Sequence, residues 1–147
     1  MRLEWPEYAL ALADVAALRS EDPWLKVGAV VLRPDNSVAS IGYNGAPSGV
    51  QIDWDDRDAR RPFVIHAEVN ALRYTTPSEV RGGLIAITHR PCQACIPLIA
   101  AYGIRRVYFG VSLDPQVYSE DLLDNIAAQL DVEVQNISRG NDASSHI

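Results

Sequence analysis

Apolar and polar positions in the first third of the chain follow one helical pattern and two strand patterns. Residues 5–20 carry apolar side chains at steps of three and four, which places them on one face of a helix. These side chains are Tyr8, Leu12, Val15 and Leu18. Residues 27–32 and 38–43 are rich in β-branched residues, and the Pro, Asp and Asn within residues 33–36 favour a turn between them. The pattern predicts a helix followed by a β-hairpin.

The rest of the chain predicts alternating helices and strands after a long polar connection. Residues 44–62 contain early Gly and Pro and then an acidic run, which indicates a surface loop and a candidate lid. The predicted helices cover residues 66–75, 92–102 and 122–130, and the predicted strands cover residues 84–88, 107–111 and 132–137. Gly103 is placed to end the second of these helices, and Ser119 to cap the third.

The order of these elements predicts the fold class. The strand-helix-strand units in the second half require parallel pairing through right-handed crossovers, whereas the hairpin is antiparallel. We therefore expect a three-layer α/β/α sandwich on a five-stranded mixed sheet. Residues 1–137 form a single domain in this interpretation, and the polar residues 138–147 form a disordered tail.

Composition narrows the possible partners. The 147 residues are 48% hydrophobic, enough for one sizeable core, and they contain neither an 18-residue apolar run nor the apolar stretch of a signal peptide. We expect a cytoplasmic protein without a membrane partner. The net charge of -6 disfavours a polymeric nucleic acid as partner, because such a partner requires a basic surface. A small nucleotide needs only a local basic pocket.

Four residues carry the candidate chemistry. His66 and Glu68 form a His-x-Glu pair, and the only two cysteines, Cys92 and Cys95, follow Pro91 in a Pro-Cys-x-x-Cys sequence. This combination resembles the signature of zinc deaminases. Two cysteines three residues apart on a helix lie on one face, where a single Zn²⁺ can bind both sulfurs. His66 would be the third ligand, which leaves the fourth tetrahedral position open to water, as in catalytic zinc sites.

Glu68 is the candidate proton carrier. Residues two apart on a helix point in different directions, so Glu68 is not expected to be a zinc ligand beside His66. A carboxylate near a zinc-bound water can accept its proton and deliver it to the ring nitrogen and the leaving amine. Taken alone, Cys-x-x-Cys is also typical of structural zinc knuckles and redox pairs. The combination with His-x-Glu favours a catalytic site with one Zn²⁺ per chain.

Further blocks resemble the deoxycytidylate (dCMP) deaminase family of the cytidine deaminase-like superfamily, over about residues 9–137. They are Arg-Ser-Glu-Asp-Pro at residues 19–23, Lys-Val-Gly-Ala at 26–29, Gly-Tyr-Asn-Gly-Ala-Pro-Ser-Gly at 42–49 and Pro-Phe-Val-Ile-His-Ala-Glu-Val-Asn-Ala at 62–71. The resemblance implies hydrolysis of dCMP to dUMP and ammonia. It also implies a homo-oligomer, often a hexamer, that responds to the effectors dCTP and dTTP.

The resemblance also suggests substrate contacts. Asn44 matches the superfamily's sugar-contacting Asn, and the backbone of Ala67 matches the group that reads the pyrimidine carbonyl. For Asn44, a turn residue with left-handed backbone is the alternative interpretation. Five other residues are candidates for contacts with phosphate, base or sugar, against the alternative of ordinary surface or core roles: Arg19, Trp24, Lys26, His89 and Tyr118.

Other functions remain open at this point. Residues 51–61 and 112–118 are unlike the corresponding family segments, so the effector response and the exact substrate are not decided by the resemblance. The chain also lacks spare cysteines for a second, structural zinc. Another deaminase substrate is one alternative: cytidine, a modified dCMP, guanine or tRNA adenosine. A non-catalytic scaffold stabilised by zinc is the other.

Overall fold

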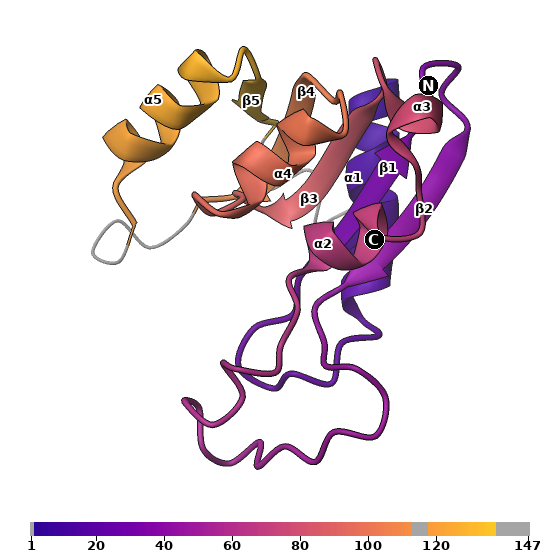
Figure 1. Ribbon diagram of the computed structural model, residues 1–147. Coiled ribbons are helices and arrows are strands. Elements are labelled where there is room, and N and C mark those ends of the chain that lie inside the picture. The colour runs from indigo at the N-terminus through magenta and orange to yellow at the C-terminus, as the bar shows by residue number, and fades with distance from the viewer. Residues whose placement is uncertain (1, 113–117, 138–147) are drawn as a thin grey trace.

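The computed structural model describes residues 2–112 and 118–137, which are arranged around a five-stranded sheet (Figure 1). The strands are β1 (Gly28–Leu32), β2 (Val38–Tyr43), β3 (Leu84–His89), β4 (Arg106–Val111) and β5 (Glu133–Asn136). Their order across the sheet is β2-β1-β3-β4-β5. β1 is antiparallel to both β2 and β3, whereas β3, β4 and β5 are parallel. The predicted hairpin, the parallel second half and the mixed sheet are confirmed.

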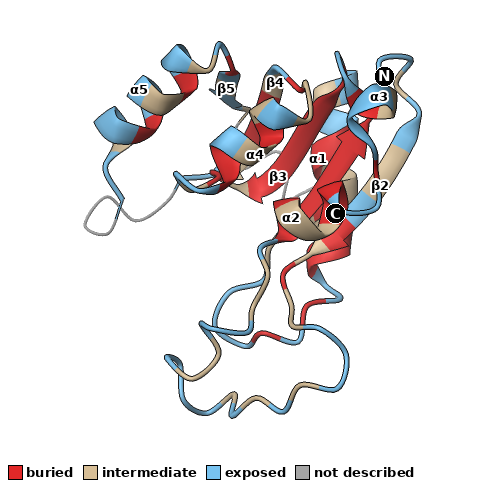
Figure 2. Ribbon diagram, viewed as in Figure 1, coloured by how far each residue is buried: buried red, intermediate tan, exposed pale blue. Residues whose placement is uncertain are grey.

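Helices cover both faces of this sheet. α1 (Trp5–Ala17) packs on one face, and α2 (Ala67–Leu72) and α4 (Cys95–Ala101) pack on the other. α5 (Glu120–Gln129) packs against α4 and β5. β1 and most of β3 are buried between the layers, as the red strands in Figure 2 show. The three layers confirm the predicted α/β/α sandwich.

Of the four residues in the predicted apolar stripe of α1, Leu12 packs against the core and the other three are exposed. Tyr8, Val15 and Leu18 are 40%, 63% and 77% exposed. The buried face consists of small residues and one leucine: Ala9, Leu10, Ala13, Ala16 and Ala17. A Cβ on Gly28 of β1 would lie only 1.9 Å from the Ala13 carbonyl oxygen, so α1 approaches β1 more closely than large side chains would permit. The periodicity predicted the helix but not its buried face.

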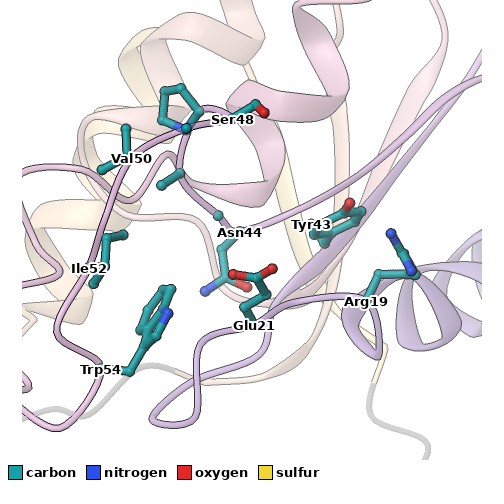
Figure 3. A pocket seen from close by; sticks show the side chains of 12 residues that line it. Arg19, Glu21, Tyr43, Asn44, Ser48, Val50, Ile52 and Trp54 are labelled. Atoms are coloured by element: carbon teal, nitrogen blue, oxygen red, sulfur yellow. The ribbon is translucent and has the colours of Figure 1, made fainter.

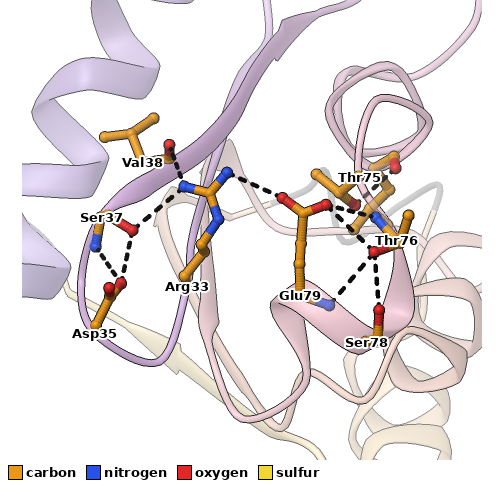
Figure 4. Close-up of polar contacts among 9 residues, drawn as sticks. Arg33, Asp35, Ser37, Val38, Thr75, Thr76, Ser78 and Glu79 are labelled. Carbon is orange, nitrogen blue, oxygen red and sulfur yellow. Dashed lines mark hydrogen bonds and ion pairs between the residues drawn. The ribbon is translucent and has the colours of Figure 1, made fainter.

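A short helix, α3 (Pro77–Val80), was not predicted from the sequence. Thr76 and Glu79 form a capping box in which each side chain bonds to the other residue's backbone N–H. Arg33, in the turn between β1 and β2, donates to Glu79 at 3.0 Å and to the Val38 carbonyl at 2.9 Å (Figure 4). These contacts fasten the β1–β2 turn to the segment that follows α2.

Several boundaries differ from the predictions at the points where functional residues lie. α1 ends at Ala17 rather than residue 20, and α2 begins at Ala67, so that His66 precedes it as an extended N-cap residue. Cys92 precedes α4 in a turn instead of lying on the helix. The predicted tail, residues 138–147, lies outside the described residues. Within the described part of the chain, no helix has the length and apolar character needed to span a membrane.

The connection between β2 and α2 is an irregular loop, as predicted, and it extends away from the sheet in Figure 1. Its two ends are joined by a pair of backbone hydrogen bonds between Gly45 and Ile65, at 3.1 and 2.9 Å. Asn44 precedes the first of these residues and His66 follows the second. The loop therefore begins and ends at two of the predicted site residues.

Candidate active site

Two helix starts on the same face of the sheet bring the three predicted metal ligands together. His66 is the N-cap residue of α2, and Cys95 is the first residue of α4. The Cys92 carbonyl accepts a hydrogen bond from the Cys95 N–H at 3.0 Å, which closes the turn that carries both cysteines. The ligand atoms of His66, Cys92 and Cys95 all lie within 4.8 Å of one another. Among the described residues, this is the one such group of His, Cys, Asp or Glu.

The distances within this group fit tetrahedral zinc. His66 Nδ1 lies 3.3 Å from Cys95 Sγ and 3.6 Å from Cys92 Sγ, and the two sulfurs lie 3.8 Å apart. Zinc bonds of about 2.3 Å to sulfur and about 2.0 Å to nitrogen, at tetrahedral angles, require separations of about 3.8 Å between sulfurs and about 3.6 Å between sulfur and nitrogen. The donor set therefore suits one Zn²⁺, and its fourth position is free for a water or a substrate atom.

The electrostatics of the two thiols differ. The hydrogen bond with Cys95 lowers the pKa of Cys92 to about 3, which favours the thiolate form of Cys92 at neutral pH. The same bond, together with burial, raises the pKa of Cys95. The hydrogen bond with Cys92 raises the pKa of His66. One sulfur is thus already in the form that binds a metal, and the other must lose its proton when the metal binds.

Glu68 lies directly beside the ligand group without belonging to it. Its side chain is hydrogen-bonded to Cys95, and the residue is 4% exposed. Burial is the main cause of its raised pKa. The expectation that Glu68 is not a ligand was based on helical geometry, but His66 lies before the helix, so that reasoning was wrong. What the arrangement provides is a buried carboxyl group, next to a ligand, that can take up and release a proton.

A pocket of about 300 Å³ lies at the start of the β2–α2 loop. Asn44 lines it, and Figure 3 shows its amide beside the Glu21 carboxylate, with Arg19 and Tyr43 on one side and Ile52 and Trp54 on the other. Its lining includes neither the three ligands nor Glu68. Asn44 and Arg19 are the predicted contact residues that line it.

The Asn44 side chain is held in one orientation by the backbone of a neighbouring segment. Its Oδ1 accepts from the Val27 N–H at 2.8 Å, and its Nδ2 donates to the Leu25 carbonyl at 2.8 Å. An amide oxygen can accept twice and an amide nitrogen can donate twice, so one acceptor and one donor position remain. Asn44 is absent from the positive-φ residues of the described chain, so the left-handed turn interpretation is wrong.

The other predicted contact residues are dispersed. Trp24 is 46% exposed and donates from its ring to the Trp54 carbonyl at 2.9 Å, and Lys26 donates to the Ser20 carbonyl at 2.5 Å. His89 is half-buried and lies 2.9 Å from the Thr88 hydroxyl, and burial lowers its pKa. Tyr118 is 37% exposed. None of these four lines the pocket, and a ligand contact by any of them remains a prediction.

Ala67, the first residue of α2, is buried between His66 and Glu68. Its N–H is one of the groups at a helix start that have no acceptor within the helix. Its predicted contact with a pyrimidine carbonyl is compatible with that position and remains a prediction.

Sequence reasoning missed several residues around the site. Glu21, Tyr43 and Trp54 line the pocket, and a buried ion pair joins Asp22 to Arg60. Asp22 lies in the Arg-Ser-Glu-Asp-Pro block at residues 19–23, and this family resemblance could have marked it as a candidate. Arg60 lies in a run of charged residues, where nothing in the pattern separates a buried arginine from exposed ones.

The sandwich, the His-Cys-Cys group and the adjacent buried carboxyl group define a zinc-binding protein of the cytidine deaminase-like superfamily. The model of the family "Cytidine and deoxycytidylate deaminase zinc-binding region" matches residues 3–111, most of the chain, and the chain belongs to that family. Zinc is the cofactor that this family membership and the ligand group support.

Relatives and solved structures agree with this assignment. The chain is 39% identical to deoxycytidylate deaminase of Mycobacterium phage D29 over 123 residues, covering 74% of this chain and 95% of the phage protein. It is 39% identical to the Homo sapiens enzyme over 115 residues, covering 73% of this chain but only 65% of the human protein. The crystal structure of dCMP deaminase from cyanophage S-TIM5 in complex with dCMP and dUMP superposes with a TM-score of 0.75. That pair is 30% identical and covers 93% of this chain and 99% of the phage chain.

Proposed function

We propose that the protein is a zinc-dependent hydrolase that converts dCMP to dUMP and ammonia. The observation that carries the proposal is a buried carboxyl group, Glu68, beside three ligands whose spacing suits tetrahedral zinc with one open position. The relatives named deoxycytidylate deaminase, and the similar structure with dCMP and dUMP bound, support this substrate over other bases.

Each residue has a distinct task in this reaction. His66, Cys92 and Cys95 would hold the Zn²⁺, which when bound would supply Lewis-acid activation of water. Glu68 accepts a proton as water adds to C4 of the pyrimidine, and it delivers protons to the ring nitrogen and to the amino group that leaves as ammonia. Its raised pKa suits both steps, because a proton carrier works best with a pKa close to the working pH.

The substrate contacts follow from the remaining donors and acceptors. The Ala67 N–H faces no helical acceptor and would read the pyrimidine carbonyl. The Asn44 amide already accepts one hydrogen bond from Val27 and donates one to Leu25. Its remaining acceptor and donor positions would bind the sugar hydroxyl. Asn44 and His66 directly flank the Gly45–Ile65 backbone bridge, and this arrangement is compatible with contacts from both residues to one small nucleotide.

Assembly and regulation belong to the same proposal. A cytoplasmic homo-oligomer, up to a hexamer, that responds to dCTP and dTTP is what the family resemblance favours. The exposed apolar residues of α1 are compatible with a subunit contact. Size-exclusion chromatography with light scattering, with and without each triphosphate, tests both parts.

A non-catalytic zinc scaffold is the competing function. A structural site normally has four protein ligands, whereas one cluster of three is present among the described residues. In a scaffold, the buried Glu68 carboxyl group beside the ligands would lower stability and would have no function. Both observations favour catalysis.

The test is ammonia release by the purified, zinc-loaded protein. The substrates are dCMP, CMP, deoxycytidine, cytidine, 5-methyl-dCMP, guanine and a tRNA anticodon stem-loop. Turnover of dCMP above all others is the expected result. Turnover of another substrate would retain the zinc chemistry and refute the dCMP assignment, and no turnover at all would favour the scaffold.

A further inference from the structure

A buried ion pair lies outside the metal group and the pocket lining. Arg60 Nη1 lies 3.0 Å from Asp22 Oδ2, and the two side chains are 12% and 0% exposed. The neighbouring pair of Arg61 and Asp58, at 3.1 Å, is 65% and 82% exposed. Removing charges from water is costly unless they are paired and hydrogen-bonded, so a buried pair in an otherwise exposed loop needs a reason.

Asp22 uses its other oxygen to fix the segment that leads into β1. Its Oδ1 accepts from the Trp24 N–H at 2.8 Å and from the Leu25 N–H at 3.2 Å. One carboxylate thus holds two consecutive backbone amides on one side and a guanidinium on the other. The position of residues 24–25 is set by Asp22, and the position of Asp22 is set in part by Arg60.

The same segment holds the Asn44 amide. The Leu25 carbonyl accepts from Asn44 Nδ2, and the Val27 N–H donates to Asn44 Oδ1, both at 2.8 Å. The direction of the one free donor and the one free acceptor of Asn44 therefore depends on where Leu25 and Val27 lie. A shift of that backbone would turn the free groups away from a ligand.

Arg60 also belongs to the segment that ends at the metal ligand. Its carbonyl accepts from the Phe63 and Val64 N–H groups at 3.0 and 3.1 Å, and Ile65 and His66 follow. The ion pair therefore connects the approach to His66 with the segment that orients Asn44.

We propose that Arg60 and Asp22 are positioning residues for the nucleotide, acting through Asn44 and not through the metal. This inference rests on the proposed function, because it assigns Asn44 to the substrate. Loss of the pair should weaken substrate binding and leave the chemistry and the zinc unchanged.

The test compares Arg60→Gln with the matched control Arg61→Gln, which removes the adjacent arginine from an exposed pair. Arg60→Lys is the second variant, because it keeps the charge and so the fold but lacks the planar fork of arginine. Four quantities are measured: hydrogen exchange of the Val27 amide, KM for dCMP, kcat for dCMP, and zinc content.

For Arg60→Gln we expect faster exchange of the Val27 amide and a KM raised about ten-fold. A ten-fold rise corresponds to the loss of one hydrogen bond of ordinary strength between Asn44 and the substrate. The kcat should stay within about two-fold and the zinc content should not change, since no transition-state contact is removed. Arg61→Gln should match the wild type. Arg60→Lys should give intermediate values, and it decides the question if Arg60→Gln does not fold.

The proposal is overturned if Val27 exchange and KM stay at wild-type values in the Arg60 variants, if kcat or zinc falls instead of KM rising, or if Arg61→Gln has the same effect. If the wild-type protein releases no ammonia from dCMP, the proposed function fails. The exchange of the Val27 amide then decides by itself whether Arg60 positions Asn44.

Discussion

Replacing Gly42 by alanine tests how closely the packing of the sheet controls the site. A Cβ at Gly42, in β2, would lie 2.4 Å from the Ala71 backbone nitrogen and 2.7 Å from the Ala67 carbonyl oxygen of α2. Ordinary contacts of a Cβ begin near 3.4 Å, so α2 must move by about 1 Å. That helix carries Glu68 and begins directly after His66, so both would move with it. A misplacement of about 1 Å can lower activity about a hundred-fold.

The expected result for Gly42→Ala is a fall of about a hundred-fold in kcat/KM for dCMP, with a stability loss of about 1–3 kcal/mol from overpacking. Gly45→Ala is a control for stability, because a Cβ there would meet nothing within 4 Å, although Gly45 lines the pocket beside Asn44. Its melting temperature should stay close to wild type. Wild-type activity in Gly42→Ala, or an equal loss of stability in Gly45→Ala, would show that packing at Gly42 does not control the site.

Three further predictions concern the metal, pH and a helix cap. Adding zinc at a hundred times its Kd should stabilise the metal-free protein by about 2.7 kcal/mol. Cys95→Ala should abolish this gain in thermal unfolding, and an undiminished gain would exclude the assigned site. Burial lowers the pKa of His89 in the folded protein, so His89 binds a proton more readily in the unfolded chain than in the folded one. The contribution of His89 to stability is therefore lost as the pH falls below about 6.5, the ordinary pKa of histidine. Urea unfolding at pH 5.5 and 7.5 should show a smaller fall in His89→Gln, and an equal fall would contradict this. Thr76→Ala should cost about 1 kcal/mol in the same assay by removing the cap of α3, whereas Ser78→Ala should cost under about 0.5 kcal/mol.

The sequence predicted the fold and the metal group well because their signals are local. The β-branched runs, the Gly103 stop and the Ser119 cap depend on nearby residues, and the structure contains each of them. The ligand set followed from a motif whose residue types zinc requires. The closeness of the two sulfurs was predicted from both cysteines lying on one helix, and this reason was wrong for Cys92. Cys92 lies in a turn before α4, and its sulfur is still 3.8 Å from that of Cys95.

The features that the sequence did not reveal depend on distant partners. The buried face of α1 is decided by how closely β1 approaches the helix at Gly28. The sequence around Gly28 does not indicate this contact, because it depends on how the helix and the strand pack together. Arg60 could not be distinguished from Arg61 by pattern, because burial and the ion pair to Asp22 come from a segment nearly forty residues away. The pocket likewise combines residues 19–21 with residues 43–54.

In the proposed reaction, Glu68 moves protons at a zinc site formed by His66, Cys92 and Cys95. The most direct measurement is ammonia release from dCMP by the wild-type protein and by Glu68→Gln, with zinc per chain measured on the same samples. We expect one zinc in both proteins, with turnover in the wild type and a loss of at least about a hundred-fold in the variant. Turnover that survives in Glu68→Gln with zinc still bound would contradict this role of Glu68.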